Sequence, residues 1–228
     1  RYDLMRTRFE PVEEIPNPFR KVAWLNGNWQ FRVAPDPEWH TVAVPHVWNS
    51  IPGLEDYEGP AEYRIRFMTP DGWSGGRVFV RFGAIAGAAQ LVVNGVEIAR
   101  HDSRFLPLEA EITDALDATD ENTLELRIDN RPGPADAAAV AGEKNFGGPY
   151  REVCLELTGP VRIERALVES APGVRDGATA TARIEAVISA RSGERVNVFG
   201  SVAREPGGAK TVFEQQVSAD ERSRATFE

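Results

Sequence analysis

The stretch of this chain best suited to chemistry is residues 145–153, which reads NFGGPYREV. Gly147 and Gly148 before a proline predict a tight bend, because glycine takes positive φ without strain and proline fixes its own φ. Arg151 stands where the bend becomes a strand, and a guanidinium there could clamp carbonyls or a carboxylate with several planar donors. The stretch predicts either a structural corner or a loop that lines a binding cleft.

The strand after the bend should place Val153, Leu155 and Leu157 on one face, and Cys154 and Glu156 on the other. Cys154 is the only cysteine, so the chain forms no internal disulfide and the redox compartment stays open. Because Cys154 lies inside a strand, we interpret it as a packing residue and not as a nucleophile.

Other catalytic patterns are absent from the sequence. His40, His46 and His101 lack metal-ligand spacing, and we expect His46 to pack beside Trp48. There is no glycine-rich phosphate or dinucleotide loop. Residues 72–76 read GWSGG, which has the spacing of a nucleophile elbow, but an expected strand and not a helix follows, so we expect no such elbow. We therefore expect no metal and no cofactor.

The composition is globular, with 42% hydrophobic and 27% charged residues and a net charge of -9. This charge argues against nucleic acid and anionic membranes as partners, because both require a basic face. No apolar run approaches the roughly 20 residues of a membrane span. The chain begins at Arg1 without a methionine, so the compartment stays undecided between cytoplasmic and periplasmic or secreted.

The elements that would position the bend are short strands. Residues 1–23 are proline-containing and aperiodic, which predicts an extended arm. Residues 24–165 show alternating patterns without a helical period, so we expect an all-β, two-sheet antiparallel sandwich of jelly-roll type. The expected strands include residues 29–31, 39–45, 63–67, 78–82, a hairpin over 90–98, 124–128 and 153–157.

Long loops and early tryptophans stand out in this first domain. Residues 46–60 form a long loop, and long ordered loops are more often functional than ordinary connectors. Four of the five tryptophans lie before residue 50. They either pack in the core and on sheet faces or form an aromatic platform for a sugar.

Residues 166–228 predict a second domain of immunoglobulin-like type. Only about five strands fit, whereas such sandwiches have roughly seven. We therefore expect a truncated domain, cut from a longer chain, whose open strand edges support association between copies.

The order of these motifs resembles the amino-terminal sugar-binding domain of family 2 glycoside hydrolases, the β-galactosidase and β-glucuronidase type of bacterial enzyme. The resemblance covers residues 24–165, with the remainder similar to the immunoglobulin-like domain of that family. It is carried by LNGNWQF at 25–31, VPHVW at 44–48, DYEG at 56–59 with Tyr63, VNG at 93–95, ITD at 112–114, residues 122–130 and residues 146–153.

The resemblance implies retaining hydrolysis by two glutamates carried on a β/α barrel of about 250 residues. The acid/base glutamate of the family follows an asparagine, and this chain contains no Asn-Glu pair. We therefore expect no catalytic residue here and no hydrolysis by this chain alone. Its carbohydrate substrate would bind through the missing barrel.

The resemblance further implies that two loops of this domain reach the sugar. Asp56 matches the first position, where asparagine is usual. The second position, an acidic residue before the double-glycine bend, falls on Gly142, and Glu143, Lys144 and Asn145 substitute for it by position only. We predict substrate contacts from Asp56, Glu143, Lys144 and Asn145, with an ordinary surface loop as the alternative for each.

Two other functions remain open. One is a free-standing carbohydrate-binding module, favoured by the tryptophans and long loops. The other is a structural interaction domain, since a sandwich fold does not fix function.

Overall fold

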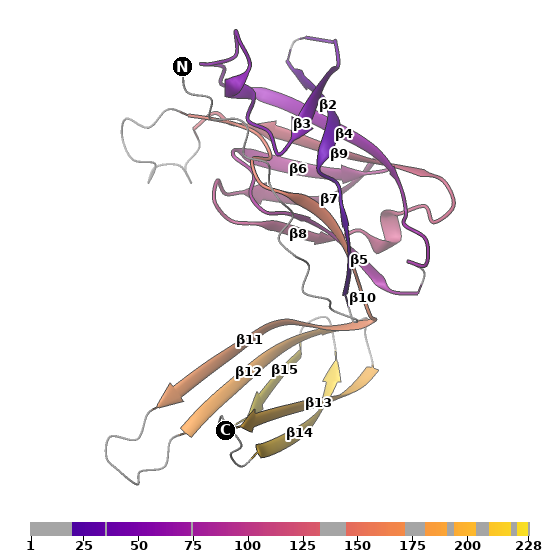
Figure 1. The fold of residues 1–228 in the computed structure, drawn as a ribbon, viewed down its shortest axis with the longest axis vertical. Helices are drawn as coiled ribbons and strands as arrows, with labels where there is room; N and C mark the ends of the chain where they lie inside the picture. Colours follow the sequence, from indigo (N-terminus) through magenta and orange to yellow (C-terminus); the bar gives the residue numbers. More distant parts are fainter. Residues whose placement is uncertain are drawn as a thin grey trace. The chain divides into compact units, whose positions relative to one another are not determined.

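The computed structural model describes residues 20–34, 36–73, 75–132, 145–171, 181–190, 194–203, 210–219 and 223–227. These residues form fifteen strands and two short 3-10 turns, so the fold is all-β, as the sequence predicts (Figure 1). The chain divides into two compact units, residues 1–157 and 158–228. The predicted boundary after residue 165 falls inside β11 (Val161–Ala171), a strand of the second unit.

The larger sheet of the first unit has six antiparallel strands in the order β3-β2-β4-β9-β6-β7. Their bounds are β2 Gly27–Val33, β3 His40–Val44, β4 Pro60–Met68, β6 Ala88–Val93, β7 Val96–Asp102 and β9 Glu121–Asp129. β4 and β9 pair along their whole length, from Pro60 opposite Asp129 to Met68 opposite Glu121. This pairing brings the chain before β4 and the chain after β9 to the same end of the sheet.

The smaller sheet has four strands in the order β1-β10-β5-β8. They are β1 Arg20–Trp24, β5 Arg77–Phe82, β8 Leu108–Glu111 and β10 Val153–Thr158. The last residues of the expected arm thus form β1, while residues 1–19 lie outside the described part of the chain. β10 is buried on both faces, and Glu156 is tolerated there because Arg20 pairs with its carboxylate at 3.0 Å.

The core of the first unit lies between these two sheets. Trp29 on β2 and Phe82 on β5 meet edge to face, with ring centroids 6.3 Å apart. Trp29 and Trp48 are fully buried, so the core interpretation is right for both. Trp39 instead lies against two guanidiniums, with Arg32 and Arg64 4.4 and 4.3 Å from its ring centroid. These two cations compete with a sugar for the Trp39 ring.

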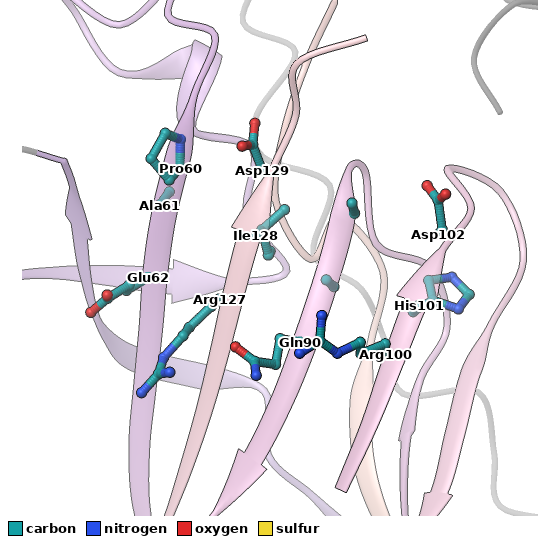
Figure 2. Close-up of a pocket in the computed structure, with 12 residues that line it drawn as sticks. Pro60, Ala61, Glu62, Gln90, Arg100, His101, Asp102, Arg127, Ile128 and Asp129 are labelled. Carbon is teal, nitrogen blue, oxygen red and sulfur yellow. The ribbon is translucent and has the colours of Figure 1, made fainter. Parts of the chain in front are cut away.

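The outer face of the six-stranded sheet carries charged side chains that alternate with buried apolar ones. Its ion pairs are Arg32–Glu62, Arg66–Glu121, Arg100–Glu97 and Arg127–Glu125. A shallow groove of about 460 Å³ crosses this face over β4, β9, β6 and β7 (Figure 2).

The second unit is a smaller sandwich of five described strands. β11, β12 (Thr181–Ala190) and β15 (Ser223–Phe227) form one sheet, and β13 (Glu194–Ala203) pairs with β14 (Lys210–Ala219) in the other. Ile188 and Val198 pack together between the sheets. Phe199 on β13 and Val212 on β14 are 65% and 64% exposed, so apolar surface remains open on this unit.

Candidate functional site

The double-glycine bend packs directly against an aromatic cluster. A Cβ at Gly147 would lie 1.9 Å from Cζ2 of Trp48, and one at Gly148 would lie 2.5 Å from the carbonyl oxygen of His46. Gly148 also has a φ of +128°, which side chains rarely adopt. Both positions therefore require glycine. A side chain at Gly147 would clash with Trp48, and one at Gly148 would clash with the His46 carbonyl and would also need an unfavourable φ.

Backbone hydrogen bonds join the bend to two other loops. The amide of His46 donates to the Pro149 carbonyl at 2.8 Å, and the amide of Trp48 donates to the Gly147 carbonyl at 3.1 Å. Gly148 and Ala86 exchange amide-to-carbonyl bonds of 3.2 and 2.9 Å. Three segments distant in sequence are thus fixed together at one edge of the first unit.

The cluster beneath the bend contains Phe31, His46, Trp48 and Tyr63. His46 contacts the rings of Phe31 and Tyr63, with centroids 5.3 and 5.7 Å away, and Trp48 contacts the same two rings. Burial lowers the pKa of His46 to about 4 and raises the pKa of Tyr63 well above its usual value. The imidazole is therefore neutral near pH 7, and its Nδ1 lies 2.7 Å from the Tyr63 hydroxyl.

Asn145 joins the bend to the loop before β4. Its Nδ2 donates to the Asn130 carbonyl at 2.7 Å and to Oε1 of Glu58 at 2.9 Å. Its Oδ1 accepts a hydrogen bond of 2.6 Å from Nη1 of Arg104. Arg104 also donates to the carbonyls of Asn130 and Phe146, so one guanidinium braces three segments.

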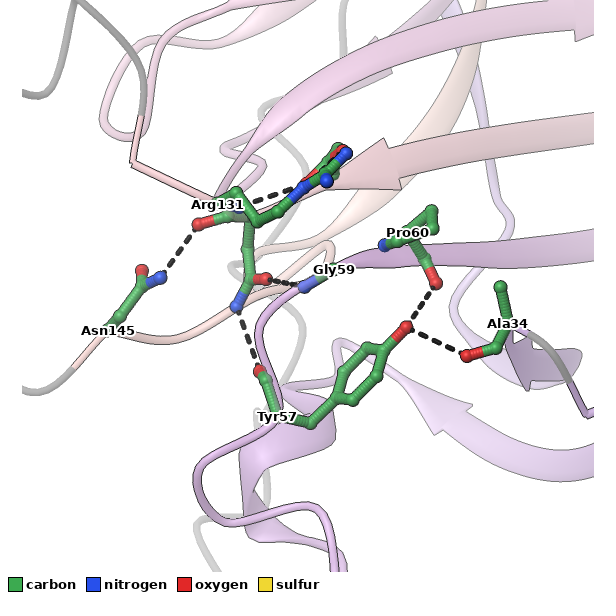
Figure 3. Close-up of polar contacts among 8 residues, drawn as sticks. Ala34, Tyr57, Gly59, Pro60, Arg131 and Asn145 are labelled. Carbon is green, nitrogen blue, oxygen red and sulfur yellow. Dashed lines mark hydrogen bonds and ion pairs between the residues drawn. The ribbon is translucent and has the colours of Figure 1, made fainter.

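Asn130 holds the loop before β4 from the other side. Its side chain is fully buried; Oδ1 accepts from the Gly59 amide at 2.8 Å, and Nδ2 donates to the Tyr57 carbonyl at 3.4 Å. Figure 3 shows the Tyr57 hydroxyl beside the carbonyls of Pro60 and Ala34, and its single proton is shared between these two acceptors, 2.8 and 3.1 Å away. The loop is therefore tied to the ends of three strands.

Asn49 fixes the same loop from within. Its Nδ2 donates to the carbonyls of Leu54, Glu55 and Tyr57 at 3.1 to 3.3 Å. Its Oδ1 accepts from the Gly147 amide at 2.9 Å. We call the assembly of residues 46–59, Arg104, Asn130 and residues 145–150 the braced rim.

The site residues predicted from the sequence take different positions relative to the braced rim. Asp56 is exposed in a turn beside Tyr57, and Asn145 lies at the centre of the hydrogen-bond network. Glu143 and Lys144 lie outside the described residues. Arg151 is exposed, and its Cβ packs over Gly83.

Sequence reasoning missed Arg104 and did not assign a role to Asn49 or Asn130. The sequence around Asn49 and Asn130 offered only local signals of a role. Asn130 ends an alternating strand just before a Pro-Gly pair, and Asn49 follows Trp48 at the start of a long loop. Their partners are up to 98 residues away, and no sequence periodicity links such pairs.

Neither a cluster of metal ligands nor a membrane-spanning helix occurs in the part of the chain that the structure describes. No group of three or more His, Cys, Asp or Glu side chains there could hold a metal ion. No described helix is long and apolar enough to cross a membrane.

The two antiparallel sheets, with loops fixed at one edge, place the first unit in the class of β-sandwich domains. Residues 56–157 match the family model described as glycosyl hydrolase 2 galactose-binding domain-like. This part of the chain is therefore similar to the galactose-binding-like domain of glycoside hydrolase family 2, and the chain matches the amino-terminal region of β-glucuronidases and β-galactosidases.

Individual relatives agree with this assignment. The chain is 33% identical over 127 residues to a β-glucuronidase of Paenibacillus borealis, covering 49% of this chain and 21% of the relative. It is 32% identical over 157 residues to a β-glucuronidase of Bacteroides fragilis, covering 66% of this chain and 22% of the relative. A solved Bacteroides uniformis β-glucuronidase shares the fold over 91% of this chain and 27% of its own, with 21% identity and a TM-score of 0.76. The chain thus spans about a fifth of the length of its curated relatives.

Proposed function

We propose that this chain is the non-catalytic amino-terminal region of a glycoside hydrolase that acts on β-glucuronides or β-galactosides. The observation that carries the proposal is the braced rim, because hydrogen bonds from Asn49, Asn130 and Asn145 tie its loops together where an unbraced connector would suffice. The names of the relatives support the class of substrate. Residues beyond this chain would supply the acid/base and nucleophile glutamates.

The rim would contribute binding and shape to the active site of the catalytic domain. Carboxylates and amides suit sugars, because hydroxyl groups both donate and accept hydrogen bonds. Asp56 and Asn145 come from the two loops that the Asn145–Glu58 hydrogen bond joins. We assign them, with Glu143 and Lys144, to substrate contact or to the positioning of such contacts.

The chain alone would be inactive. A retaining hydrolase needs two carboxyl groups about 5 Å apart on a rigid scaffold. The sequence has no Asn-Glu pair of the kind that carries the acid/base residue in this family.

The test uses the full-length polypeptide encoded by the gene, assayed on aryl β-galactosides, β-glucuronides and β-mannosides. We expect hydrolysis of at least one, and we expect Asp56→Ala or Asn145→Ala to raise KM about tenfold with a smaller change in kcat. Asp71→Ala is the matched control, since Asp71 is an exposed aspartate beyond the opposite end of β4. Silence on every aryl glycoside would refute the proposal.

A free-standing carbohydrate-binding module is the second candidate, and the groove on the six-stranded sheet favours it. Calorimetry of this chain with oligosaccharides separates the two candidates, provided that the longer polypeptide is assayed in parallel. Binding without hydrolysis by the longer polypeptide would select the module.

A further inference from the structure

The groove on the outer face of the six-stranded sheet is built by strand register. Pro60, Asp129, Ala88 and Asp102 lie opposite one another on β4, β9, β6 and β7. Two residues along, Glu62, Arg127, Gln90 and Arg100 form a parallel row on the same face, as Figure 2 shows.

Residue size explains why the surface dips here. Between the two rows, Ala61, Ile128 and Ala89 point inward and are at most 5% exposed. In the first row, Ala88 offers only a methyl group to solvent, whereas long side chains stand around it. The floor is therefore apolar carbon from Ala88 and Pro60, and the walls are polar.

The walls consist of planar polar groups, each of which can form two hydrogen bonds with neighbouring hydroxyl groups of a sugar. Glu62 supplies a carboxylate, Gln90 an amide, and Arg100 and Arg127 supply guanidiniums. A pyranose ring presents C–H groups on its faces and hydroxyls at its edge, so it complements an apolar floor between polar walls.

The wall residues are already oriented by partners outside the groove. Arg32 donates to Glu62 at 2.8 Å, and Arg100 donates to Glu97 at 2.6 Å. Gln90 donates to the same Glu97, which leaves its carbonyl oxygen as an acceptor facing the groove. Ordering these side chains on binding therefore costs little entropy.

The charge of the lining selects the class of ligand. Together with their ion-pair partners, the lining residues supply five carboxylates and four guanidiniums. The carboxylates are Glu62, Asp102, Asp129, Glu97 and Glu125, and the guanidiniums are Arg100, Arg127, Arg32 and Arg131. A polyanion would meet net repulsion here, whereas a neutral chain would not.

We propose that this groove is a binding site for a neutral oligosaccharide, separate from the braced rim. The inference is independent of the proposed hydrolase, because the groove lies entirely within this chain and can be tested without a catalytic domain. It is also the site that the second candidate, a carbohydrate-binding module, would use. The groove is shallow, so we expect a dissociation constant of about 1 mM.

The experiment is a ¹H–¹⁵N NMR titration of the 228-residue chain with neutral β-linked gluco-, manno-, xylo- and galacto-oligosaccharides, and with an oligogalacturonate. For at least one neutral sugar we expect saturable shifts of the Ala88, Gln90 and Arg127 amides. We expect the oligogalacturonate to bind at least about tenfold more weakly, for the charge reason given above.

Two variants disable the groove by different means. Ala88→Arg fills the floor at an exposed position, and the double variant Gln90→Ala with Arg127→Ala removes wall groups. Each should weaken binding at least about tenfold, whereas Arg66→Ala, on the same sheet face outside the groove, should leave it within about twofold.

The proposal is overturned if no neutral oligosaccharide shifts the groove amides at about 10 mM, ten times the expected dissociation constant. It is equally overturned if the shifts gather at residues 46–59 and 145–150, if Ala88→Arg leaves binding unchanged, or if the oligogalacturonate binds as tightly as the neutral sugars.

Discussion

Gly147 is the residue at which the smallest substitution should do the most damage. Gly147→Ala would place a methyl carbon 1.9 Å from the buried ring of Trp48, which neighbouring side chains hold in place. We expect a loss of about 3 kcal/mol in the free energy of unfolding of the first unit, because the close-packed side chains around Trp48 cannot move far enough to remove the clash. Urea unfolding followed by tryptophan fluorescence measures it.

Gly159→Ala is the control for this prediction. Its nearest neighbour would be the Val161 carbonyl oxygen at 3.7 Å, an ordinary contact, so the expected change is within about 0.5 kcal/mol. Equal stability of the Gly147→Ala and Gly159→Ala variants would show that the bend does not pack on Trp48 as described.

His46 should make the first unit sensitive to acid. Its pKa is about 4 in the folded chain and 6.5 when unfolded, so between these values the unfolded state binds the extra proton. Stability contributed by the neutral imidazole is fully present above pH 6.5 and is lost as pH falls toward 4. The loss is about 2 kcal/mol, after allowance for partial exposure of the ring.

Urea unfolding of the unaltered chain and of His46→Gln at several values between pH 4 and pH 7 tests this. The glutamine variant keeps a polar side chain but does not titrate, so its stability should fall less over that range. Parallel pH profiles for the two proteins would mean that His46 is protonated equally in both states.

At the scale of elements, Asn130 links the end of β9 to the loop before β4. Asn130→Ala would leave the Gly59 amide without its side-chain acceptor, at a cost of about 2 kcal/mol, whereas the Tyr57 carbonyl would keep the hydrogen bond from Asn49. Hydrogen exchange at the Gly59 amide should accelerate, since that amide donates to Asn130 Oδ1. Asn28→Ala, at an exposed position on β2, serves as the control. Unchanged protection of Gly59 would contradict the braced rim.

The strands themselves were largely predictable, because apolar alternation is a local signal. Tyr63 is fully buried on β4 between the more exposed Glu62 and Arg64, as the pattern indicates. Both faces of β10 are buried, including the face that carries Cys154 and Glu156. The burial of this second face was not predictable, since it depends on a central position in the sheet and on an ion pair with Arg20. Burial raises the pKa of the Cys154 thiol to about 11, which fits a packing residue.

The braced rim illustrates the other limit of sequence reasoning. The glycine pair predicted a bend, but not that Trp48 fills the space beside it. Arg104 reaches Asn145 across 41 residues of sequence, and a single arginine in a loop carries no signal of its partner. The family resemblance, which rests on the order of many motifs, is confirmed by the family-model match over residues 56–157.

At the scale of the whole molecule, the second unit should promote association between copies. Phe199 and Val212 expose apolar surface on β13 and β14, and an exposed sheet with apolar side chains recruits other surfaces. Phe199→Ser should raise the dissociation constant of the dimer about tenfold, whereas Arg195→Ser, an exposed change on the same strand, should not. Light scattering over a concentration series measures this, and a monomer at the highest concentration would contradict it.

The account as a whole holds that binding and positioning reside in this chain, whereas bond cleavage belongs to residues outside it. The most direct measurement compares the 228-residue chain with the full-length gene product on aryl β-glucuronides and β-galactosides, at equal molar concentration. We predict turnover by the longer polypeptide and none above the uncatalysed rate by the chain alone. Turnover by the isolated chain, abolished by substitution of one of its own carboxylates, would contradict the account.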